Sequence, residues 1–410
     1  MTSWTRPGSA IATIALLPAL LATSGCGDSA SAAGADYAVM TWSPSGTGAF
    51  DRSGVTALAE VIGKDVNAKG GLNGHHLRVI TCNEHNTVDG GNACVRQAVD
   101  NKVIAVIGSY SLNSDSLLPG LEAAKIPYIG GYGLSGAEFS SPLSYPVAGG
   151  TPSLIAGNGR QLVAAGCRTI ALVRPDTEAG DTLTGYLGSA LRPDGVKLVD
   201  VKVSEKAPDY GDAARKALGD DRPGTCASLA LAPEQTAKLL DAYRKLAPKH
   251  TLLGAEIGSV PQSVVGPQGG GDGPLNNAYV TGWYPPTASR AWDALRVMLG
   301  SDNRVDPSDL AVQTTWVAYQ VFLQAAERLR AAGTPLTSKS LRDQLDSEDS
   351  LDTGGVTPRL SWSEMLPSGD SPRLVNTWVT YQQVKGGQLV EQQSGFLDMR
   401  WVLTGGKPPQ

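Results

Sequence analysis

The stretch Val103-Ile-Ala-Val-Ile-Gly-Ser-Tyr-Ser-Leu-Asn-Ser-Asp-Ser116 indicates how this chain is organised. Its first five residues are apolar and mostly β-branched, a pattern typical of a strand buried on both faces. The small polar residues that follow lead to a predicted helix start at Ser114 and Asp115. In open parallel sheets, ligands lie beyond the carboxyl ends of strands, where helix N-termini expose unpaired N–H groups. We therefore expect this loop to bind the anionic end of a small molecule.

Strand-like and helical stretches alternate along most of the chain. A first series has predicted strands at 37–42, 77–82, 103–107 and 127–130, with predicted helices at 55–66, 88–101 and 114–125. A second series has predicted helices at 154–165, 181–191, 212–218 and 233–246, with predicted strands at 169–173, 196–203, 227–231 and 251–254. Such alternation is typical of parallel sheets with right-handed crossovers. It predicts an α/β fold, either as two Rossmann-like halves or as a two-lobed clam-shell.

The remaining residues are too few to form a third domain of this kind. The glycine-rich stretch 266–274 is expected to be a flexible loop, and it lacks the Gly-Lys-Ser/Thr ending of a P-loop. A further strand at 278–281 and a long helix over 308–330 are expected, followed by a hairpin that turns at Lys385-Gly-Gly. These elements should complete the two lobes.

The N-terminus has the features of an export signal. Arg6 supplies the positive charge, residues 11–22 are apolar, and the segment ends in Leu21-Ala-Thr-Ser-Gly-Cys26. This ending resembles the lipobox of bacterial lipoproteins, although Thr23 stands where a leucine is usual. The resemblance implies a signal peptide at 1–25, lipidation of Cys26 and a tether at 26–35, which would anchor the protein outside the bacterial cell membrane. A plain secretory signal is the alternative.

Composition and cysteine spacing narrow the function classes. The net charge is −5 and no basic stripe carries interleaved aromatics, which argues against a nucleic-acid partner. In an oxidising compartment the four remaining cysteines are expected to form disulfides, for which three pairings are possible. We expect Cys82–Cys94 and Cys167–Cys226, because each pair lies within one half of the chain. No Cys-x-x-Cys occurs, so no metal site is predicted.

Three segments carry a resemblance to a known family. They are Ser45-Gly-Thr-Gly-Ala-Phe-Asp-Arg-Ser-Gly54, Asn67-Ala-Lys-Gly-Gly-Leu-Asn-Gly74, and Val106-Ile-Gly-Ser109 followed by Ile126-Pro-Tyr-Ile129. From about residue 37 to 397 the chain resembles the solute-binding lipoproteins of ABC importers, which have the type I periplasmic-binding fold, in the leucine/isoleucine/valine-binding branch.

The resemblance implies two α/β lobes joined by three hinge crossings, near 147–152, 281–286 and 352–358. Lobe 1 would comprise 36–149 and 285–355, and lobe 2 would comprise 150–284 and 356–410. Such a protein is expected to be a monomer without cofactor. It would close on a small amino acid, amide or carboxylate and present it to an ABC permease. A ligand-sensing lipoprotein that signals to a membrane partner without transport is the alternative.

The resemblance also suggests ligand-binding residues. The loops after the third and fourth strands would hold the ligand carboxylate through hydroxyls and N–H groups, and Glu256 matches the acidic residue that takes the α-ammonium of amino acids. Trp42, at the end of the first strand, could face the ligand or fill the core. Asn113, Ser114 and Ser135 could equally be plain helix caps, and Glu256 could be a solvated loop residue. The candidates are Trp42, Tyr110, Ser111, Asn113, Ser114, Tyr132, Gly133, Ser135 and Glu256.

The second half departs from the family pattern. Ala179 stands where amino-acid binders carry an aromatic before a glycine, and Leu231 and Ala232 stand where they carry tyrosines. This wall should therefore be smaller and less aromatic, which leaves room for another ligand. The four histidines, His75, His76, His85 and His250, accompany no nucleophile arrangement, so we predict no catalytic residues and no enzyme activity.

Overall fold

The fold is described from a computed structural model of the 410-residue chain. It describes residues 36–48, 51–204, 206–348, 350–367 and 371–407. The predicted signal peptide and the whole predicted tether at 26–35, which includes Cys26, lie outside these residues.

The first sheet is entirely parallel and has the strand order β2-β1-β3-β4-β5. Its strands are β1 (Tyr37–Ser43), β2 (Leu77–Asn83), β3 (Val106–Ile107), β4 (Tyr128–Ile129) and β5 (Ser144–Tyr145). Strand β3 is shorter than predicted, but Ile104 N–H still donates to the carbonyl of Ala38 at 2.8 Å, so this stretch runs beside β1 as expected. All of residues 103–107 are buried, as their apolar sequence predicts.

The described helices of lobe 1 pack on this sheet or on the helices that cover it. Four precede the first exit of the chain and three follow its return: α1 (Ser53–Ala68), α2 (Val88–Asp100), α3 (Ser114–Ala124), α4 (Gly136–Ser140), α10 (Asp293–Leu299), α11 (Leu310–Ala331) and α12 (Ser338–Asp346). Helix α11 buries most of its residues against the sheet, among them Trp316, Tyr319 and Phe322. The sequence predicted α11 but missed α4, β5, α10 and α12, which are too short to show clear periodicity.

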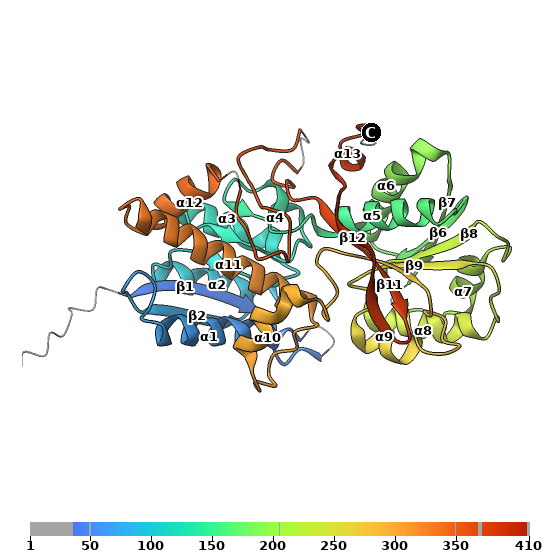
Figure 1. The fold of residues 1–410 in the computed structure, drawn as a ribbon, viewed down its shortest axis with the longest axis horizontal. Helices are drawn as coiled ribbons and strands as arrows, with labels where there is room; N and C mark the ends of the chain where they lie inside the picture. The colour runs from blue at the N-terminus through green and yellow to red at the C-terminus, as the bar shows by residue number, and fades with distance from the viewer. Residues whose placement is uncertain (1–35, 49–50, 205, 349, 368–370, 408–410) are drawn as a thin grey trace, which may run out of the picture. The chain divides into compact units, whose positions relative to one another are not determined.

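The second sheet has seven strands in the order β12-β11-β10-β9-β8-β6-β7 (Figure 1). They are β6 (Thr169–Pro175), β7 (Lys197–Val203), β8 (Thr225–Leu229), β9 (Leu252–Glu256), β10 (Tyr279–Gly282), β11 (Trp378–Lys385) and β12 (Gln388–Asp398). The first five are parallel, whereas β11 and β12 form the predicted hairpin and pair antiparallel. The two-lobed α/β fold with parallel sheets is confirmed, with a mixed edge on the second sheet.

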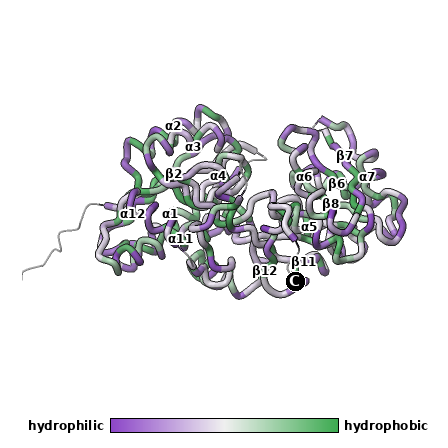
Figure 2. The backbone as a smooth tube through the Cα atoms, turned by 90° about the horizontal axis from the view of Figure 1, so that it is seen from above, coloured by the Kyte–Doolittle hydropathy of each residue, from purple (hydrophilic) through white to green (hydrophobic). Residues whose placement is uncertain are grey.

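Lobe 2 also includes α5 (Gly150–Ala164), α6 (Glu178–Leu191), α7 (Gly211–Leu218), α8 (Pro233–Arg244), α9 (Gln262–Gln268) and α13 (Arg400–Leu403). Helix α9 corrects one prediction, because Gly266 and Pro267 were assigned to a flexible loop. Val264 and Val265 are buried in the core of lobe 2, and this burial favours a helical turn there. In both lobes the tube of Figure 2 alternates between hydrophobic and hydrophilic segments, as expected for elements that each bury one face.

The chain passes between the lobes three times. It leaves lobe 1 between β5 and α5 and returns between β10 and α10. The third passage was predicted at 352–358, but that segment stays on lobe 1, because Val356 and Trp362 are buried in its core. Trp362 Nε1 and Asn376 Nδ2 both donate to the carbonyl of Pro146 at 2.9 Å. The third passage therefore lies close to Thr377, just before β11.

Both expected disulfides are confirmed. Cys82–Cys94 joins the end of β2 to α2, and Cys167–Cys226 joins the segment before β6 to β8. Within the described residues, no helix is both long and apolar enough to cross a membrane.

Candidate functional site

Arg52 and Tyr110 meet at the carboxyl ends of β1 and β3. Tyr110 follows β3, and its N–H donates to the carbonyl of Trp42 at 3.0 Å. Arg52 immediately precedes α1, where its carbonyl accepts from Ser43 Oγ at 2.9 Å. Its guanidinium carbon lies 5.2 Å from the centroid of the Tyr110 ring, within cation–π distance. Tyr110 was a predicted site residue, whereas Arg52 was only quoted within a family motif.

Three aromatic rings continue from this contact in a row. The ring centroids of Tyr110 and Tyr132 are 5.0 Å apart, and those of Tyr132 and Trp283 are 5.3 Å apart, both in edge-to-face geometry. Tyr132 follows β4, and Trp283 follows β10 at the start of the second passage between the lobes. Trp283 Nε1 donates to the carbonyl of Gly150 at 3.1 Å, in the first passage. The sequence named Trp283 only as part of a crossing, since nothing local indicates which ring it meets.

Glu256 brings lobe 2 to the same place. It ends β9, and its two carboxylate oxygens accept from Gly258 N–H and from Ser259 Oγ, each at 2.6 Å. Burial raises the pKa of Glu256, although these hydrogen bonds oppose the rise. Burial also raises the pKa of Tyr132, and the charges of Tyr110, Glu256 and Asp309 add to that rise. Glu256 therefore lies close enough to Tyr132 to act on it electrostatically.

The predicted donors in the two anion-binding loops are engaged within their own loops. Ser111 Oγ accepts from the N–H of Asn113 at 3.0 Å, and Ser114 Oγ donates to the carbonyl of Ser111 at 3.4 Å. Ser135 Oγ accepts from the N–H of Glu138 and forms a capping box with it. These contacts favour the helix-cap interpretation for Ser135, whereas the hydroxyls of Ser111 and Ser114 bond within the loop before α3 without capping it.

Gly133 has a structural reason to be glycine. Its φ is +82°, and a Cβ atom there would lie 2.9 Å from Phe139 Cζ. On either side of the predicted donors, Leu112 and Leu134 are 42% and 39% exposed, which is unusual for leucines in this chain. The two loops therefore present apolar side chains. In the second loop the N–H groups of Leu134 and Ser135 already donate to the carboxylate of Glu138, at 2.8 and 3.0 Å.

Buried polar atoms without a hydrogen-bond partner gather at the ends of β1 and β2. Seven such side-chain atoms occur among the described residues, and four of them are Trp42 Nε1, Thr47 Oγ1, Glu84 Oε1 and Asn86 Oδ1. The loops that carry them are joined, because Asn83 exchanges two hydrogen bonds with the backbone of Ser45, each at 3.0 Å. Leaving such a group unpaired costs ~1–3 kcal/mol, so their concentration indicates a place where water or a ligand supplies the partners.

Trp42 itself fills the core. It is fully buried and stacks on Tyr128 with ring centroids 5.9 Å apart, and its Nε1 is buried without a hydrogen-bond partner among the described residues. Glu84 is fully buried as well, and Asn113 Nδ2 donates to its Oε2 at 3.4 Å. Burial raises the pKa of Glu84, with the side chains of Asn113 and Ser111 opposing the rise. Sequence reasoning missed Glu84, because a glutamate after a strand resembles any solvated loop residue.

The positions that depart from the family pattern lie on lobe 2. Ala179 is exposed in the first turn of α6, and Ala232 is exposed at the start of α8. Leu231 is buried in the core of lobe 2, so it offers no side chain to a ligand.

The sequence was compared with models of known protein families. A family model described as periplasmic binding protein matches residues 32–364. The chain belongs to the periplasmic binding protein family. Proteins of this family are solute-binding and not enzymatic; they lie outside the cytoplasm, bind small molecules and deliver them to the permeases of ABC-type transporters. The predicted family and fold are thus confirmed.

Solved structures of periplasmic binding proteins share the fold at low sequence identity. A fatty acid ABC transporter substrate-binding protein from Thermomonospora curvata is 17% identical, has a TM-score of 0.69, and is aligned over 87% of this chain and 92% of its own. A leucine binding protein from Thermotoga maritima is 14% identical, with a TM-score of 0.67 over 88% and 99% of the two chains. No curated protein matches the chain in sequence.

A third structure is an ABC transporter solute binding protein from Rhodopseudomonas palustris in complex with 3,4-dihydroxybenzoic acid. It is 14% identical, with a TM-score of 0.69 over 88% of this chain and 97% of its own.

Proposed function

We propose that this periplasmic binding protein is the receptor of an ABC-type importer and that its lobes close on a small carboxylate, either amino-acid-like or with an apolar or aromatic body. The observation that carries the proposal is the position of Arg52 over the Tyr110 ring, beside Tyr132 and Trp283. Among the described residues Arg52 forms no ion pair. Its guanidinium donates to the carbonyl of Asp51, and its charge also acts on the Tyr110 hydroxyl and the Asp309 carboxylate.

The chemistry of these groups suits such a ligand. A guanidinium pairs strongly with a carboxylate, and aromatic faces favour contact with apolar or planar groups. Leu112 and Leu134 add apolar surface at the same strand ends. The ligands named for the three related structures, a fatty acid, leucine and 3,4-dihydroxybenzoic acid, all have a carboxyl group, whereas their bodies differ.

Two acidic residues could receive an ammonium group if the ligand is an amino acid. Glu256 already accepts two hydrogen bonds, but each carboxylate oxygen can accept a second. Glu84 offers the unpaired Oε1, which no described residue satisfies. Both carboxyls have raised pKa values because of burial, and a cation beside either would favour its ionised form.

A matched ligand panel tests the proposal. Leucine, octanoate, benzoate and 3,4-dihydroxybenzoate would be compared with benzamide and isoamylamine, which lack the carboxylate, by thermal denaturation and calorimetry. At about 100 times Kd a ligand adds ~2.7 kcal/mol to the free energy of unfolding, so a true ligand shifts Tm clearly. Binding of the carboxylates but not of the two compounds that lack a carboxylate is expected. No response to any carboxylate would refute the carboxylate assignment.

We also propose that the protein is a monomer anchored through a lipidated Cys26, with lobe limits as predicted except for the third passage near Thr377. Replacing Cys26 with serine should move the protein from the membrane fraction to the soluble fraction. Uptake of the identified ligand should fall in cells that lack the protein. Unchanged uptake together with a lost transcriptional response would favour the sensor.

A further inference from the structure

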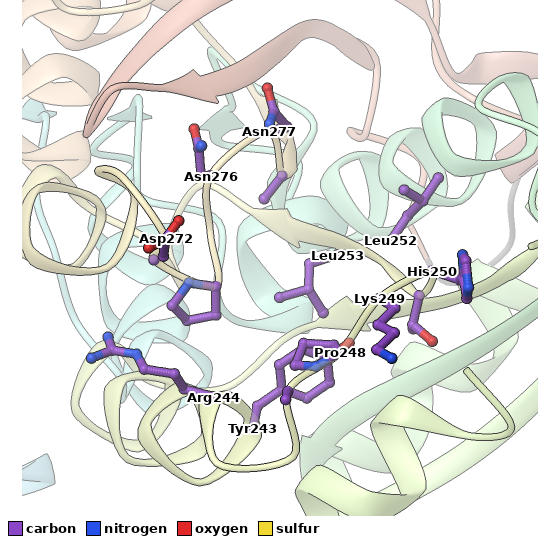
Figure 3. A pocket seen from close by; sticks show the side chains of 15 residues that line it. Tyr243, Arg244, Pro248, Lys249, His250, Leu252, Leu253, Asp272, Asn276 and Asn277 are labelled. Atoms are coloured by element: carbon purple, nitrogen blue, oxygen red, sulfur yellow. The ribbon is translucent and has the colours of Figure 1, made fainter. Parts of the chain in front are cut away.

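A cavity of about 320 Å³ lies at the amino end of β9, in lobe 2 (Figure 3). It is formed by the end of α8, the loop from α8 to β9, and the segment that precedes β10. Leu252 and Leu253 begin β9 and line the cavity, whereas Glu256 ends the same strand at the candidate ligand site. The cavity is therefore separate from that site, and its volume is at the lower end of the range for small-molecule pockets.

The charged side chains that line the cavity are mostly basic. The lining includes the basic side chains Arg244, Lys249 and His250 and one carboxylate, that of Asp272. In Figure 3, Arg244 and His250 lie on opposite sides of the view, with Tyr243, Pro248 and Leu253 between them. None of the four charged or titratable side chains forms an ion pair with another described residue, and Arg244 donates only to the amide oxygen of Gln268. The basic groups are thus available to an anion.

The Tyr243 hydroxyl is a second indication of a missing partner. Tyr243 is 2% exposed. Its hydroxyl lies near enough to the Thr251 side chain for that group to lower its pKa, but it forms no hydrogen bond of normal geometry with a described residue. Thr251, which also lines the cavity, already uses its own hydroxyl with the carbonyl of Leu218 and the carboxylate of Asp221. A buried hydroxyl without a partner is unfavourable and indicates a group that the described residues do not supply.

The loop that carries Lys249 and His250 is held in place from behind. The carboxylate of Asp221 accepts the N–H groups of Lys249 at 3.0 Å, His250 at 2.9 Å and Thr251 at 2.9 Å. Three hydrogen bonds to one ionised group fix the backbone of this loop. Because the loop is already ordered, a ligand that binds there loses little free energy to ordering it.

We propose that this cavity is a second binding site, for a small organic anion that has a carboxylate or phosphate group. The acidic group pairs with Lys249 and the neighbouring basic side chains. An oxygen of the ligand accepts the hydrogen bond that Tyr243 has to offer, and its uncharged part packs on Pro248 and Leu253. The proposal is independent of the ligand bound at Arg52.

Calorimetric titration of the full exported chain tests this site. The probes are inorganic phosphate, citrate and glucose 6-phosphate, at constant ionic strength set with chloride. At least one should bind saturably, and Lys249→Gln should weaken its affinity about tenfold, since a charged hydrogen bond is lost. Lys245→Gln is the matched control, because Lys245 neighbours Arg244 in sequence but does not line the cavity. The control should bind as the wild type does.

Tyr243→Phe gives a readout that a merely structural tyrosine would not. Because the variant removes only an unpaired hydroxyl, the ligand-free protein should melt at an equal or higher temperature while its affinity for the anion falls about fivefold. The proposal is overturned if none of the three anions binds saturably, if Lys249→Gln and Tyr243→Phe bind as the wild type does, or if Tyr243→Phe lowers the Tm of the ligand-free protein.

Discussion

Gly130 lies so close to Ala318 that a Cβ atom at Gly130 would be 2.3 Å from the Cβ atom of Ala318. Gly130 follows β4 and Ala318 lies in α11, so this contact sets how closely the helix packs on the first sheet. The φ of Gly130 is +64°, a second reason for glycine. We predict that Gly130→Ala lowers the free energy of unfolding by ~2–4 kcal/mol, measured by urea denaturation.

Gly195→Ala is the control for that change. Its φ is +64°, equal to that of Gly130, but a Cβ atom there would meet nothing within 4 Å. It should cost only the backbone strain, ~1–2 kcal/mol. Equal effects of the two changes would contradict the role given to the contact with Ala318.

Arg52→Gln should weaken binding of a carboxylate ligand by about 10- to 100-fold, because it removes the charge over the Tyr110 ring. Affinity for each compound that binds the wild type is measured by calorimetry. Arg304→Gln is the control, since Arg304 is exposed and pairs with Glu60 and Asp302, away from the aromatic row. If Arg52→Gln bound as tightly as Arg304→Gln, the carboxylate would have to be held elsewhere.

Glu84→Gln should raise Tm at neutral pH, and the gain should shrink toward acid pH. Burial raises the pKa of Glu84 above its ordinary value of 4.5, so the folded state holds its proton more tightly than the unfolded state. The resulting penalty on folding is absent well below pH 4.5 and grows as pH rises through the folded-state pKa.

Glu234→Gln should behave in the opposite way. The Lys238 side chain beside it lowers the pKa of Glu234, so its stabilising effect is present at neutral pH and is lost in acid. Thermal melts of both variants and the wild type from pH 4 to pH 8 measure these differences. A gain for Glu84→Gln that does not change with pH would be inconsistent with a raised pKa.

The two disulfides should contribute unequally to stability. Cys167–Cys226 spans 59 residues and Cys82–Cys94 spans 12. From the entropy of loop closure, removing the first costs ~4 kcal/mol and removing the second ~3 kcal/mol. Double cysteine-to-alanine variants compared by denaturant unfolding measure this order, and a reversed order would show that packing around the cysteines outweighs chain entropy.

Asp221→Asn should lower Tm at neutral pH, and the Tm of the variant should fall less than that of the wild type as the pH is lowered. Partial burial acts to raise the pKa of Asp221, but the N–H groups of His250, Thr251 and Lys249 outweigh it and hold the pKa at about 2. Since the ordinary value is 3.8, this carboxylate stabilises the fold above pH 4 and loses its effect between about pH 4 and pH 2. Melts at pH 7, 4 and 2 measure it; an equal deficit at all three would contradict the shift.

The elements that were predicted correctly are those with a clear hydrophobic pattern in their own sequence. The β-branched run at 103–107 favours a buried strand, and the long apolar face of α11 favours a helix packed on a sheet. Both elements were therefore predicted. Helix α9 was not predicted because Gly266 and Pro267 are typical of loops. The helical turn there is stabilised by packing in the core of lobe 2, which the local sequence does not show. The third passage was misplaced because Trp362 owes its position to the distant carbonyl of Pro146.

The candidate site could be predicted only in part, for a related reason. Tyr110 and Tyr132 follow strands and were found from that position. Three further site residues could not be predicted, because their contacts are with residues far away in the sequence: Arg52, Glu84 and Trp283. Arg52, for example, lies over the ring of Tyr110. The hydroxyls of Ser111, Ser114 and Ser135 show the opposite case: these residue types suit a ligand, but each hydroxyl bonds within its own loop, and that of Ser135 caps α4.

The three passages between the lobes have a consequence for how the chain is made. Helix α11, which covers the first sheet, ends at Ala331, and the second sheet receives β11 and β12 only from Trp378 to Asp398. Neither hydrophobic core can be completed when only the N-terminal part of the chain has been synthesised. A chain that stalls before residue 398 therefore exposes apolar surface in lobe 2 whatever the state of lobe 1, which makes late truncations targets for chaperones and proteases.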